Sequence, residues 1–422
     1  MDRFIIEGGR PLRGTVAVSG SKNAALPLIA AAILGDSTSV LRNVPDLRDV
    51  RTMLSILQHL GASVRYERGT LEIDPTTISS CTAPYEYVST MRGSICLLGP
   101  LLARFGEARF SMPGGCVIGP RPIDLHLKGL SRLGVRVTTE EGYIVGRAEA
   151  LVGNTVFLGG TFGSSVLATA NVMMAATLAS GETSLEFAAC EPEIQDLASF
   201  LVKMGASIEG GGTHCVRIRG VRRLHGAEHE IIPDRIEAGT FLLAGVATRG
   251  DVCVERCEPA HLTALLDLME QAGCSVSVTR NCIRARLGSA PGPVDVVTLP
   301  YPGFPTDLQA QMMAFLTRAN GVSVITEKVF PERFIHAAEL NRLGAQIALD
   351  GPKAIVRGVP HLQGAQVMAS DLRASAALVI AGLCAEGTTT VSRVYHLDRG
   401  YERFEEKLAA LGGRIVRAKE EG

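Results

Sequence analysis

Cysteine, aspartate, lysine and arginine are the residue types in this chain whose placement could do chemistry, and one loop brings a cysteine and an arginine together. The loop reads Ser111-Met-Pro-Gly-Gly-Cys-Val-Ile-Gly-Pro-Arg-Pro122, so Arg121 follows Cys116 by five positions. Its glycines and prolines disfavour a helix or a central strand. A thiol near a fixed cation on an accessible loop is expected to be reactive. The alternative is an inert cysteine, because free cysteine more often fills cores.

Three further cations, Lys22, Arg92 and Arg373, lie where helices are predicted to begin. The positive end of the helix dipole disfavours a cation there unless an anion binds beside it. The three positions therefore indicate phosphate or carboxylate ligands, with solvated surface charges as the alternative. Asp234, Thr306 and Asp371, also at predicted helix starts, are expected to be ordinary caps.

Composition excludes several classes of function. The formal net charge of −1 gives no basic footprint for nucleic acid. The longest apolar runs, such as residues 24–34, are too short to span a membrane, and the N-terminus does not resemble a signal peptide. The ten cysteines form no CxxC pair, and no histidine or cysteine cluster has metal-ligand spacing. We therefore expect a soluble cytoplasmic protein in a reducing compartment, with no metal and no nucleotide-cofactor motif.

Internal repetition predicts the architecture. Small-residue turns that suit helix C-termini recur at roughly 70-residue intervals, at Gly61, Gly134, Gly205, Gly273, Gly344 and Gly412. In each repeat an apolar helix, expected to be buried, is followed by a strand, a loop, an amphipathic helix and two strands. The apolar helices are predicted at 24–34, 95–103, 166–178, 238–247, 308–317 and 374–385, and the amphipathic ones at 47–60, 123–133, 193–204, 261–272, 334–343 and 401–411.

The ends of the chain indicate how the repeats are grouped. The last repeat stops early, and residues 4–20 match its missing half, so the N-terminal strands are predicted to complete it. The result is an α/β protein of two domains, 22–233 and 1–21 plus 234–422, with a ligand cleft between them. The Cys116 loop is the longest of six equivalent loops, which favours a functional role over an inert turn.

Six motifs resemble those of the bacterial UDP-N-acetylglucosamine enolpyruvyl transferases, or 1-carboxyvinyltransferases, of the EPSP synthase-like superfamily. They start at Ser19 (SGSKNAALP), Pro113 (PGGCVIGPRP), Phe304 (FPTDLQAQ), Glu332 (ERF), Asp371 (DLRA) and His396 (HLDRGY), and they cover essentially the whole chain in order. The resemblance implies an inside-out α/β barrel of two domains, each built from three of six repeated units.

The resemblance also implies a reaction. The enolpyruvyl group of phosphoenolpyruvate passes to the 3′-hydroxyl of UDP-N-acetylglucosamine by addition and elimination, and phosphate is released. This is the first committed step of peptidoglycan synthesis, and hence of the cell wall that sets cell shape and permits division. The implied partners are these two small molecules, without cofactor, metal, nucleic acid, membrane or obligatory protein partner.

Residue roles follow from the resemblance position by position. Cys116 matches the general acid that protonates the enol methylene and can form a covalent adduct, and Asp307 matches the base at the sugar hydroxyl. Lys22, Arg121 and Arg399 match the cations around phosphoenolpyruvate, with Asn23 beside Lys22. Positions matching the nucleotide-sugar site are Arg92, Arg121, Pro122, Ile123, Asp124, Leu125, Ser165, Val166, Asp307 and Val329, and further cleft charges are Arg333 and Arg373.

Two features bear on the acceptor and on inhibition. Gly163 stands where family members often carry Lys or Arg. This glycine leaves open the alternative that the chain is an enolpyruvyl transferase acting on another uridine nucleotide. Two further alternatives are the sister transferase that acts on shikimate 3-phosphate and a non-catalytic sensor of nucleotide sugars. Cys116 stands where some members carry Asp, which predicts inactivation by fosfomycin. His126 is expected to be structural.

Overall fold

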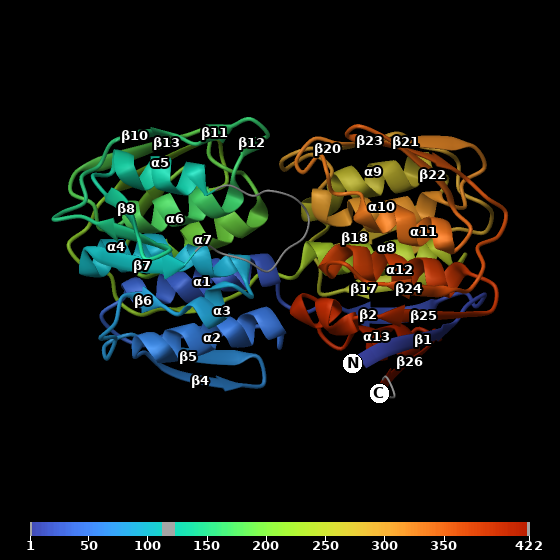
Figure 1. Cartoon of the computed structure of the whole chain (residues 1–422), viewed down its shortest axis with the longest axis horizontal. Helices are drawn as coiled ribbons and strands as arrows, with labels where there is room; N and C mark the ends of the chain where they lie inside the picture. Colours follow the sequence, from blue (N-terminus) through green and yellow to red (C-terminus); the bar gives the residue numbers. More distant parts are fainter. Residues whose placement is uncertain (1, 112–122, 420–422) are drawn as a thin grey trace. The chain divides into compact units, whose positions relative to one another are not determined.

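The computed structural model describes residues 2–111 and 123–419, which form two compact units (Figure 1). Unit A comprises residues 20–111 and 123–232, and unit B comprises residues 2–19 and 233–419. The first strands of the chain therefore belong to the same unit as its last residues. Cys116, Arg121 and Pro122 lie outside the described residues.

Unit A contains each predicted helix of its half of the chain. The predicted apolar helices are α1 (Lys22–Ala31) with the 3-10 turn η1 (Ala32–Leu34), η2 (Arg92–Leu97) with α4 (Leu98–Phe105), and α6 (Val166–Ala176). The predicted amphipathic helices are α2 (Arg48–Leu60), α5 (Asp124–Arg132) and α7 (Pro192–Lys203), and a short α3 (Tyr85–Val88) is added. The strands are β3 (Ser39–Arg42), β4 (Ser63–Glu67), β5 (Thr70–Asp74), β6 (Thr82–Ala83), β7 (Glu107–Ser111), β8 (Arg136–Glu140), β9 (Tyr143–Arg147), β10 (Thr155–Phe157), β11 (Gly159–Gly160), β12 (Gly163–Ser164), β13 (Glu182–Glu186), β14 (Ser207–Glu209), β15 (Cys215–Arg219) and β16 (Glu228–Glu230).

Unit B follows the same sequence of elements. Its apolar helices are α8 (Arg235–Ala247), η4 (Thr306–Leu308) with α10 (Gln309–Leu316), and α12 (Leu372–Cys384). Its amphipathic helices are η3 (Pro259–Leu262) with α9 (Thr263–Gln271), α11 (Ile335–Arg342), and η5 (Val394–Arg399) followed by α13 (Phe404–Ala410). The strands are β1 (Asp2–Glu7), β2 (Arg13–Ala17), β17 (Asp251–Glu255), β18 (Ser275–Thr279), β19 (Cys282–Arg286), β20 (Val296–Thr298), β21 (Val322–Glu327), β22 (Gln346–Asp350), β23 (Lys353–Arg357), β24 (Gln366–Met368), β25 (Thr388–Ser392) and β26 (Arg414–Lys419).

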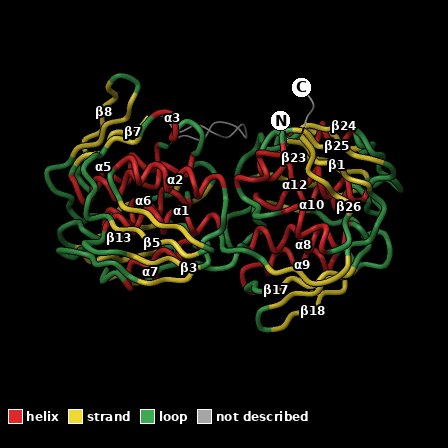
Figure 2. Tube along the Cα trace, turned by 90° about the horizontal axis from the view of Figure 1, so that it is seen from below, coloured by secondary structure: helices red, strands yellow, loops and turns green. Residues whose placement is uncertain are grey.

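Six four-stranded sheets, three in each unit, share one strand pattern in the described part of the chain. A parallel edge strand is followed by three antiparallel strands, in the orders β16-β3-β5-β4, β6-β7-β9-β8, β10-β13-β15-β14, β2-β17-β19-β18, β20-β21-β23-β22 and β24-β25-β1-β26. In each unit the strands lie on the outside and the helices between the sheets (Figure 2). The chain is a mixed α/β protein.

The N-terminal strands correct one prediction. β1 does complete the last repeat, because it pairs antiparallel with both β25 and β26. β2 does not: it pairs in parallel with β17, in the sheet of the fourth repeat. In the second, third, fifth and sixth repeats the parallel edge strand comes from the segment just before the apolar helix. Before α8 that segment is β16, which pairs with β3 in unit A, so β2 takes its place in unit B.

The apolar helices form the core of each unit, as predicted. Every residue of α8 and of α10 is buried. Helices α8, α10 and α12 pack against one another in unit B, and α6 packs against both α1 and α4 in unit A. The six glycines of the repeating turns all have φ between +88° and +105°, which confirms their predicted place at helix C-termini. The buried helices therefore hold their N-terminal ends, where the predicted cations lie, in fixed positions.

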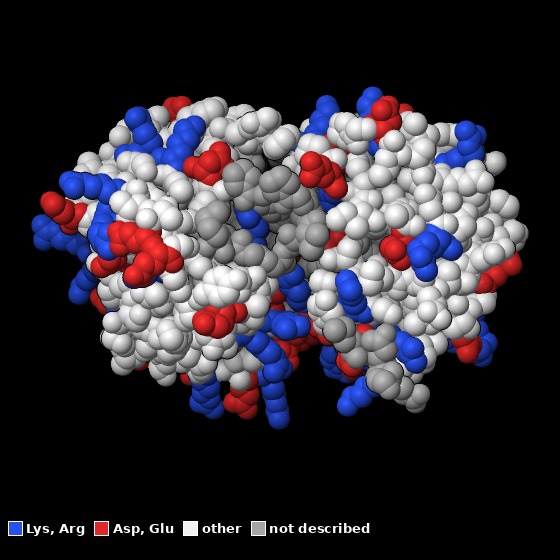
Figure 3. Space-filling model, viewed as in Figure 1, with Lys and Arg blue, Asp and Glu red and all other residues white. Residues whose placement is uncertain are grey.

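Charged side chains of both signs are interspersed over the visible face of each unit (Figure 3). No helix within the described ranges is long and apolar enough to cross a membrane.

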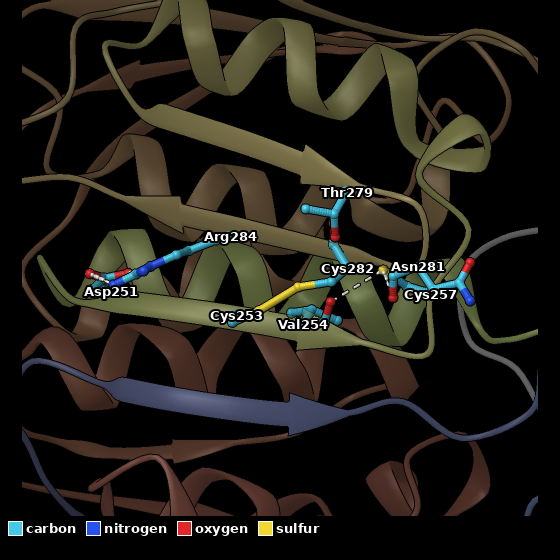
Figure 4. The surroundings of a disulfide bond; sticks show 8 residues. All are labelled: Asp251, Cys253, Val254, Cys257, Thr279, Asn281, Cys282 and Arg284. Atoms are coloured by element: carbon cyan, nitrogen blue, oxygen red, sulfur yellow. Dashed lines mark hydrogen bonds and ion pairs between the residues drawn. A yellow bond between two sulfur atoms is a disulfide. The ribbon is translucent and has the colours of Figure 1, made fainter.

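A disulfide joins Cys253 of β17 to Cys282 of β19 (Figure 4). The two strands are adjacent and antiparallel, and Cys282 lies opposite Glu255, so the bond runs diagonally between positions on one face of the sheet. The Cα atoms are 6.7 Å apart. The absence of a CxxC pair did not indicate this bond, because the two cysteines are 29 positions apart and meet only through strand pairing.

Candidate active site

The N-terminus of α1 holds Lys22 in a buried ion pair. Ser21 caps the helix, and its Oγ accepts the N–H of Ala24 at 3.3 Å. Lys22 Nζ lies 2.7 Å from Asp49 Oδ2 on α2, and these residues are 8% and 3% exposed. The anion that offsets the unfavourable dipole is therefore a carboxylate of the protein. This removes one reason to require a ligand at Lys22. Asn23 follows Lys22 in the first turn.

The remaining predicted residues of unit A lie at the N-terminal ends of three elements. Arg92 is the first residue of η2, Asp124 the first of α5 and Val166 the first of α6, with Ser165 as its cap. Ser165 Oγ accepts the N–H of Ala168 at 3.3 Å. Ile123 is buried directly before α5.

Asn171 of α6 ties these elements together. Its Oδ1 accepts the N–H of Gly99 at 2.7 Å, and its Nδ2 donates to the carbonyl of Ile95 at 2.7 Å and to Nδ1 of His126 at 2.8 Å. Burial, with the charge of Arg92 as a second cause, lowers the pKa of His126 to about 3. His126 is therefore a neutral structural histidine, as expected, and the network fixes the elements that carry Arg92 and Asp124.

The hairpin β11–β12 adjoins this end of unit A. Gly160 faces Leu125, because a Cβ built on the glycine would lie 3.0 Å from Leu125 Cδ1. Gly163 pairs with Gly160 and has a φ of +100°, a left-handed conformation that strains other residues. The glycine that departs from the family pattern thus has a backbone role in this hairpin.

In unit B, Asp307 is held by two arginines from distant parts of the sequence. Arg333 Nη1 donates to Asp307 Oδ1 at 2.8 Å, and Arg373 Nη2 donates to Oδ2 at 3.2 Å. The arginine side chains are 6% and 2% exposed, whereas that of Asp307 is 26% exposed. Two buried guanidinium groups fix the orientation of the carboxylate while part of it remains accessible, so it can face a bound hydroxyl.

A hydrogen-bonded network around Glu327 supports this pair. Thr306 Oγ1 donates to Glu327 Oε2 at 2.9 Å and accepts from Arg333 Nη1 at 3.0 Å. The predicted helix cap at Thr306 is wrong, because Pro305 occupies the cap position and the hydroxyl is used by these two side chains. Glu327 Oε1 accepts the N–H of Val329 at 2.9 Å and so positions that predicted nucleotide-sugar residue. The predicted caps at Asp234 and Asp371 are confirmed.

Arg373 is fixed from the other side by Tyr401 and the start of α12. Its guanidinium lies 5.2 Å from the centre of the Tyr401 ring. Burial would lower the pKa of Arg373, but Tyr401 and Asp307 outweigh it and the pKa is raised. Gln311 Nε2 donates to the backbone carbonyl of Asp307 at 3.0 Å and to the Tyr401 hydroxyl at 3.0 Å. The arginine is therefore a permanent cation beside Asp307.

The structure brings four of the predicted residues of unit B together. Hydrogen bonds connect one group of predicted residues in unit B, namely Asp307, Arg333, Arg373 and Val329. Arg399 is the last residue of η5 in the same unit. The sequence did not indicate the partners that the structure gives to Lys22 and His126. In the sequence, Asp49 is one polar position of an amphipathic helix and Asn171 is one position of an apolar helix. No His, Cys, Asp and Glu group within the described ranges could hold a metal ion.

Comparisons with known proteins agree on the family. The model for EPSP synthase (3-phosphoshikimate 1-carboxyvinyltransferase) matches residues 6–408. A UDP-N-acetylglucosamine 1-carboxyvinyltransferase of Anaeromyxobacter sp. (strain Fw109-5) is 56% identical over 99% of this chain and 100% of its own length. One from Methylacidiphilum infernorum (isolate V4) is 52% identical over 99% of each chain.

Solved structures show the same fold. The enolpyruvyl transferase NikO from Streptomyces tendae superposes with a TM-score of 0.90 at 28% identity, over 99% of each chain. EPSP synthase from Acinetobacter baumannii gives a TM-score of 0.75 at 19% identity, over 99% of this chain and 100% of its own, which supports the fold alone. The chain therefore belongs to the EPSP synthase family, and within it to the UDP-N-acetylglucosamine 1-carboxyvinyltransferases.

Proposed function

We propose that the chain transfers the enolpyruvyl group of phosphoenolpyruvate to the 3′-hydroxyl of UDP-N-acetylglucosamine, with release of phosphate, as the first committed step of peptidoglycan synthesis. The observation that carries this proposal is the partly exposed carboxylate of Asp307, held between Arg333 and Arg373. Relatives that are more than half identical over their full length carry the name of this reaction.

The proposed steps assign one role to each reacting group. Asp307 takes the proton of the sugar hydroxyl, and the oxygen attacks C2 of phosphoenolpyruvate. The Cys116 thiol protonates the methylene carbon C3, which gives a tetrahedral ketal. Loss of the C3 proton and departure of phosphate then form the enol ether. The same thiol, placed near C2, is the proposed site of a covalent phosphoenolpyruvate adduct.

Cations bind the two anionic substrates in this proposal. Lys22, Arg121 and Arg399 bind phosphoenolpyruvate, with Asn23 beside Lys22, because a trianion needs several positive charges. The proposed residues for the nucleotide sugar are Arg92, Pro122, Ile123, Asp124, Leu125, Ser165, Val166 and Val329, with Arg333 and Arg373 as further charges. Lys22 is already paired with Asp49, so phosphate binding would share that lysine between two anions.

The finer architecture is part of the proposal. Six sheets of one strand pattern support an inside-out α/β barrel of six repeated units, three in each of the domains 22–233 and 1–21 plus 234–422. A cytoplasmic location is proposed as well. It is supported by seven free thiols among the cysteines that the structure describes, which are typical of a reducing compartment, whereas the Cys253–Cys282 disulfide is an exception to that pattern.

The experiment that tests the function is phosphate release from phosphoenolpyruvate with three acceptors in parallel. UDP-N-acetylglucosamine is expected to support turnover, and shikimate 3-phosphate and UMP are not. Turnover with shikimate 3-phosphate alone, or with none of the acceptors, would overturn the proposal. Fosfomycin is expected to inactivate the enzyme and to leave the variant Cys116→Asp active, which tests the assignment of the thiol separately from that of the acceptor.

A further inference from the structure

One end of the sheet β18-β19-β17-β2 presents a row of polar side chains, none of which belongs to a residue assigned above. Four residues, one from each strand, lie opposite one another across this sheet. In strand order they are Ser275, Arg286, Asp251 and Arg13. Directly opposed residues in neighbouring strands point to the same face of a sheet. The four side chains therefore stand next to each other at the edge of unit B.

Arg249 adds a third guanidinium to this row. It precedes β17 by two residues and has a φ of +55°, a left-handed conformation that is uncommon outside glycine. Arg249, Arg13 and Arg286 all line one surface cavity of about 620 Å³. The rest of the lining is small or polar and comprises Gly250, Asp251, Gly273, Ser275, Leu287, Gly288 and Ser289.

The lining of this cavity carries more positive than negative charge, with three arginines and one aspartate. Asp251 is the one acidic residue of the lining, and Arg284 already binds both of its oxygens, through Nε and Nη2, each at 2.7 Å (Figure 4). Arg284 first, and then Arg286 and Arg13, lower the pKa of Asp251, so the guanidinium groups lie close to this carboxylate. No carboxylate of the described chain forms an ion pair with Arg13, Arg249 or Arg286.

Three guanidinium groups around one cavity are suited to phosphate, because each can donate two parallel hydrogen bonds to its oxygens. Ser275 and Ser289 add hydroxyl donors, and a Cβ on Gly288 would meet no atom within 4 Å, so the backbone there is open to a ligand. The volume lies in the range of small-molecule sites, well above the space that one phosphate fills. We propose that this cavity binds a small molecule with two or more linked phosphate groups.

The test is a binding titration of the full chain with inorganic tripolyphosphate at low ionic strength, followed by calorimetry. UDP-N-acetylglucosamine is kept at saturation so that the proposed active site is occupied. Arg286→Ala, Arg249→Ala and Arg13→Ala are each expected to weaken binding about tenfold, as loss of a charge-assisted hydrogen bond does. Arg280→Ala is the matched control, since Arg280 is exposed at the other end of the β18–β19 hairpin and is expected to leave affinity unchanged.

Two results would overturn the proposal: no binding of tripolyphosphate to the wild type, or an equal loss in Arg280→Ala and Arg286→Ala, which would indicate general surface charge. Enolpyruvyl transfer is measured on every variant to show that it is folded, and Arg286→Ala is expected to keep wild-type turnover. A parallel titration with ATP identifies the ligand further. Tighter binding than tripolyphosphate would assign the remaining volume to a nucleoside, and equal binding would assign the site to the phosphates alone.

Discussion

Arg373 donates a hydrogen bond to Asp307 at 3.2 Å, although the two residues are 66 positions apart in the sequence. Arg373 lies in the buried helix α12, and Asp307 lies in the 3-10 turn directly before α10. The helices α10 and α12 pack together in the core of unit B. The apolar core therefore fixes the distance between a permanent cation and the proposed base. Arg333 holds the second carboxylate oxygen, so the orientation of Asp307 is set without a ligand.

The first prediction concerns the base. Asp307→Asn is expected to lower kcat by about 10²–10⁴-fold, because an amide cannot accept the hydroxyl proton. The effect on KM should be smaller, since Arg333 and Arg373 remain. The measurement is steady-state phosphate release, with Asp267→Asn on the exposed face of α9 as the control. A variant Asp307→Asn with wild-type kcat would show that another group removes the proton.

The second prediction concerns the buried pair of Lys22 and Asp49. Asp49→Asn leaves a buried ammonium group without its carboxylate and is expected to lower the free energy of unfolding by about 3 kcal/mol. The double variant Lys22→Met with Asp49→Asn should recover part of this loss, because the buried ammonium group is removed together with its carboxylate. Urea unfolding of the single and double variants measures the coupling.

A matched control for the Lys22–Asp49 pair is the ion pair between Asp46, just before α2, and Arg51 of α2. Asp46 binds Arg51 through both oxygens at 2.7 Å, but the side chains are 39% and 68% exposed. Asp46→Asn is expected to cost less than about 1 kcal/mol, because solvent screens exposed pairs. Equal losses in Asp46→Asn and Asp49→Asn would contradict a special role of burial at Lys22.

The third prediction concerns pH and His126. Its pKa in the folded chain is lowered to about 3, so between about pH 6.5 and pH 3 the unfolded chain binds a proton at this site that the folded chain does not. This contribution to stability is complete above pH 6.5, and it falls by roughly 1.4 kcal/mol for each pH unit below it. Unfolding of the wild type and of His126→Gln at pH 7.5 and 5.5 should show a shallower pH dependence in the variant.

The control for this pH dependence is His59→Gln, on the exposed side of α2, which is expected to follow the wild type. Parallel curves for the wild type and His126→Gln would mean that His126 titrates alike in the folded and unfolded chain.

Local chemistry explains which features were predictable from the sequence. The turn glycines and the apolar helices could be predicted, because each depends on residues that are close together in the sequence. A left-handed helix C-terminus favours glycine, and a buried helix is a continuous apolar run. The parallel pairing of β2 with β17 could not, since it joins segments whose own patterns are the same in either sheet. Thr306 has the residue type of a cap, yet Glu327 and Arg333 use its hydroxyl, and only the fold reveals those neighbours.

The last prediction concerns the bond between Cys253 and Cys282. Closing a loop over 29 positions restricts the unfolded chain, so reduction is expected to lower the free energy of unfolding by up to about 3.6 kcal/mol. The variant Cys253→Ser should match the reduced wild type and should not respond to reductant. Cys215→Ser, which removes an exposed free thiol of β15, serves as the control and should respond as the wild type does. If reductant shifted the unfolding of Cys253→Ser as much as that of the wild type, the shift would have to arise from another cysteine pair.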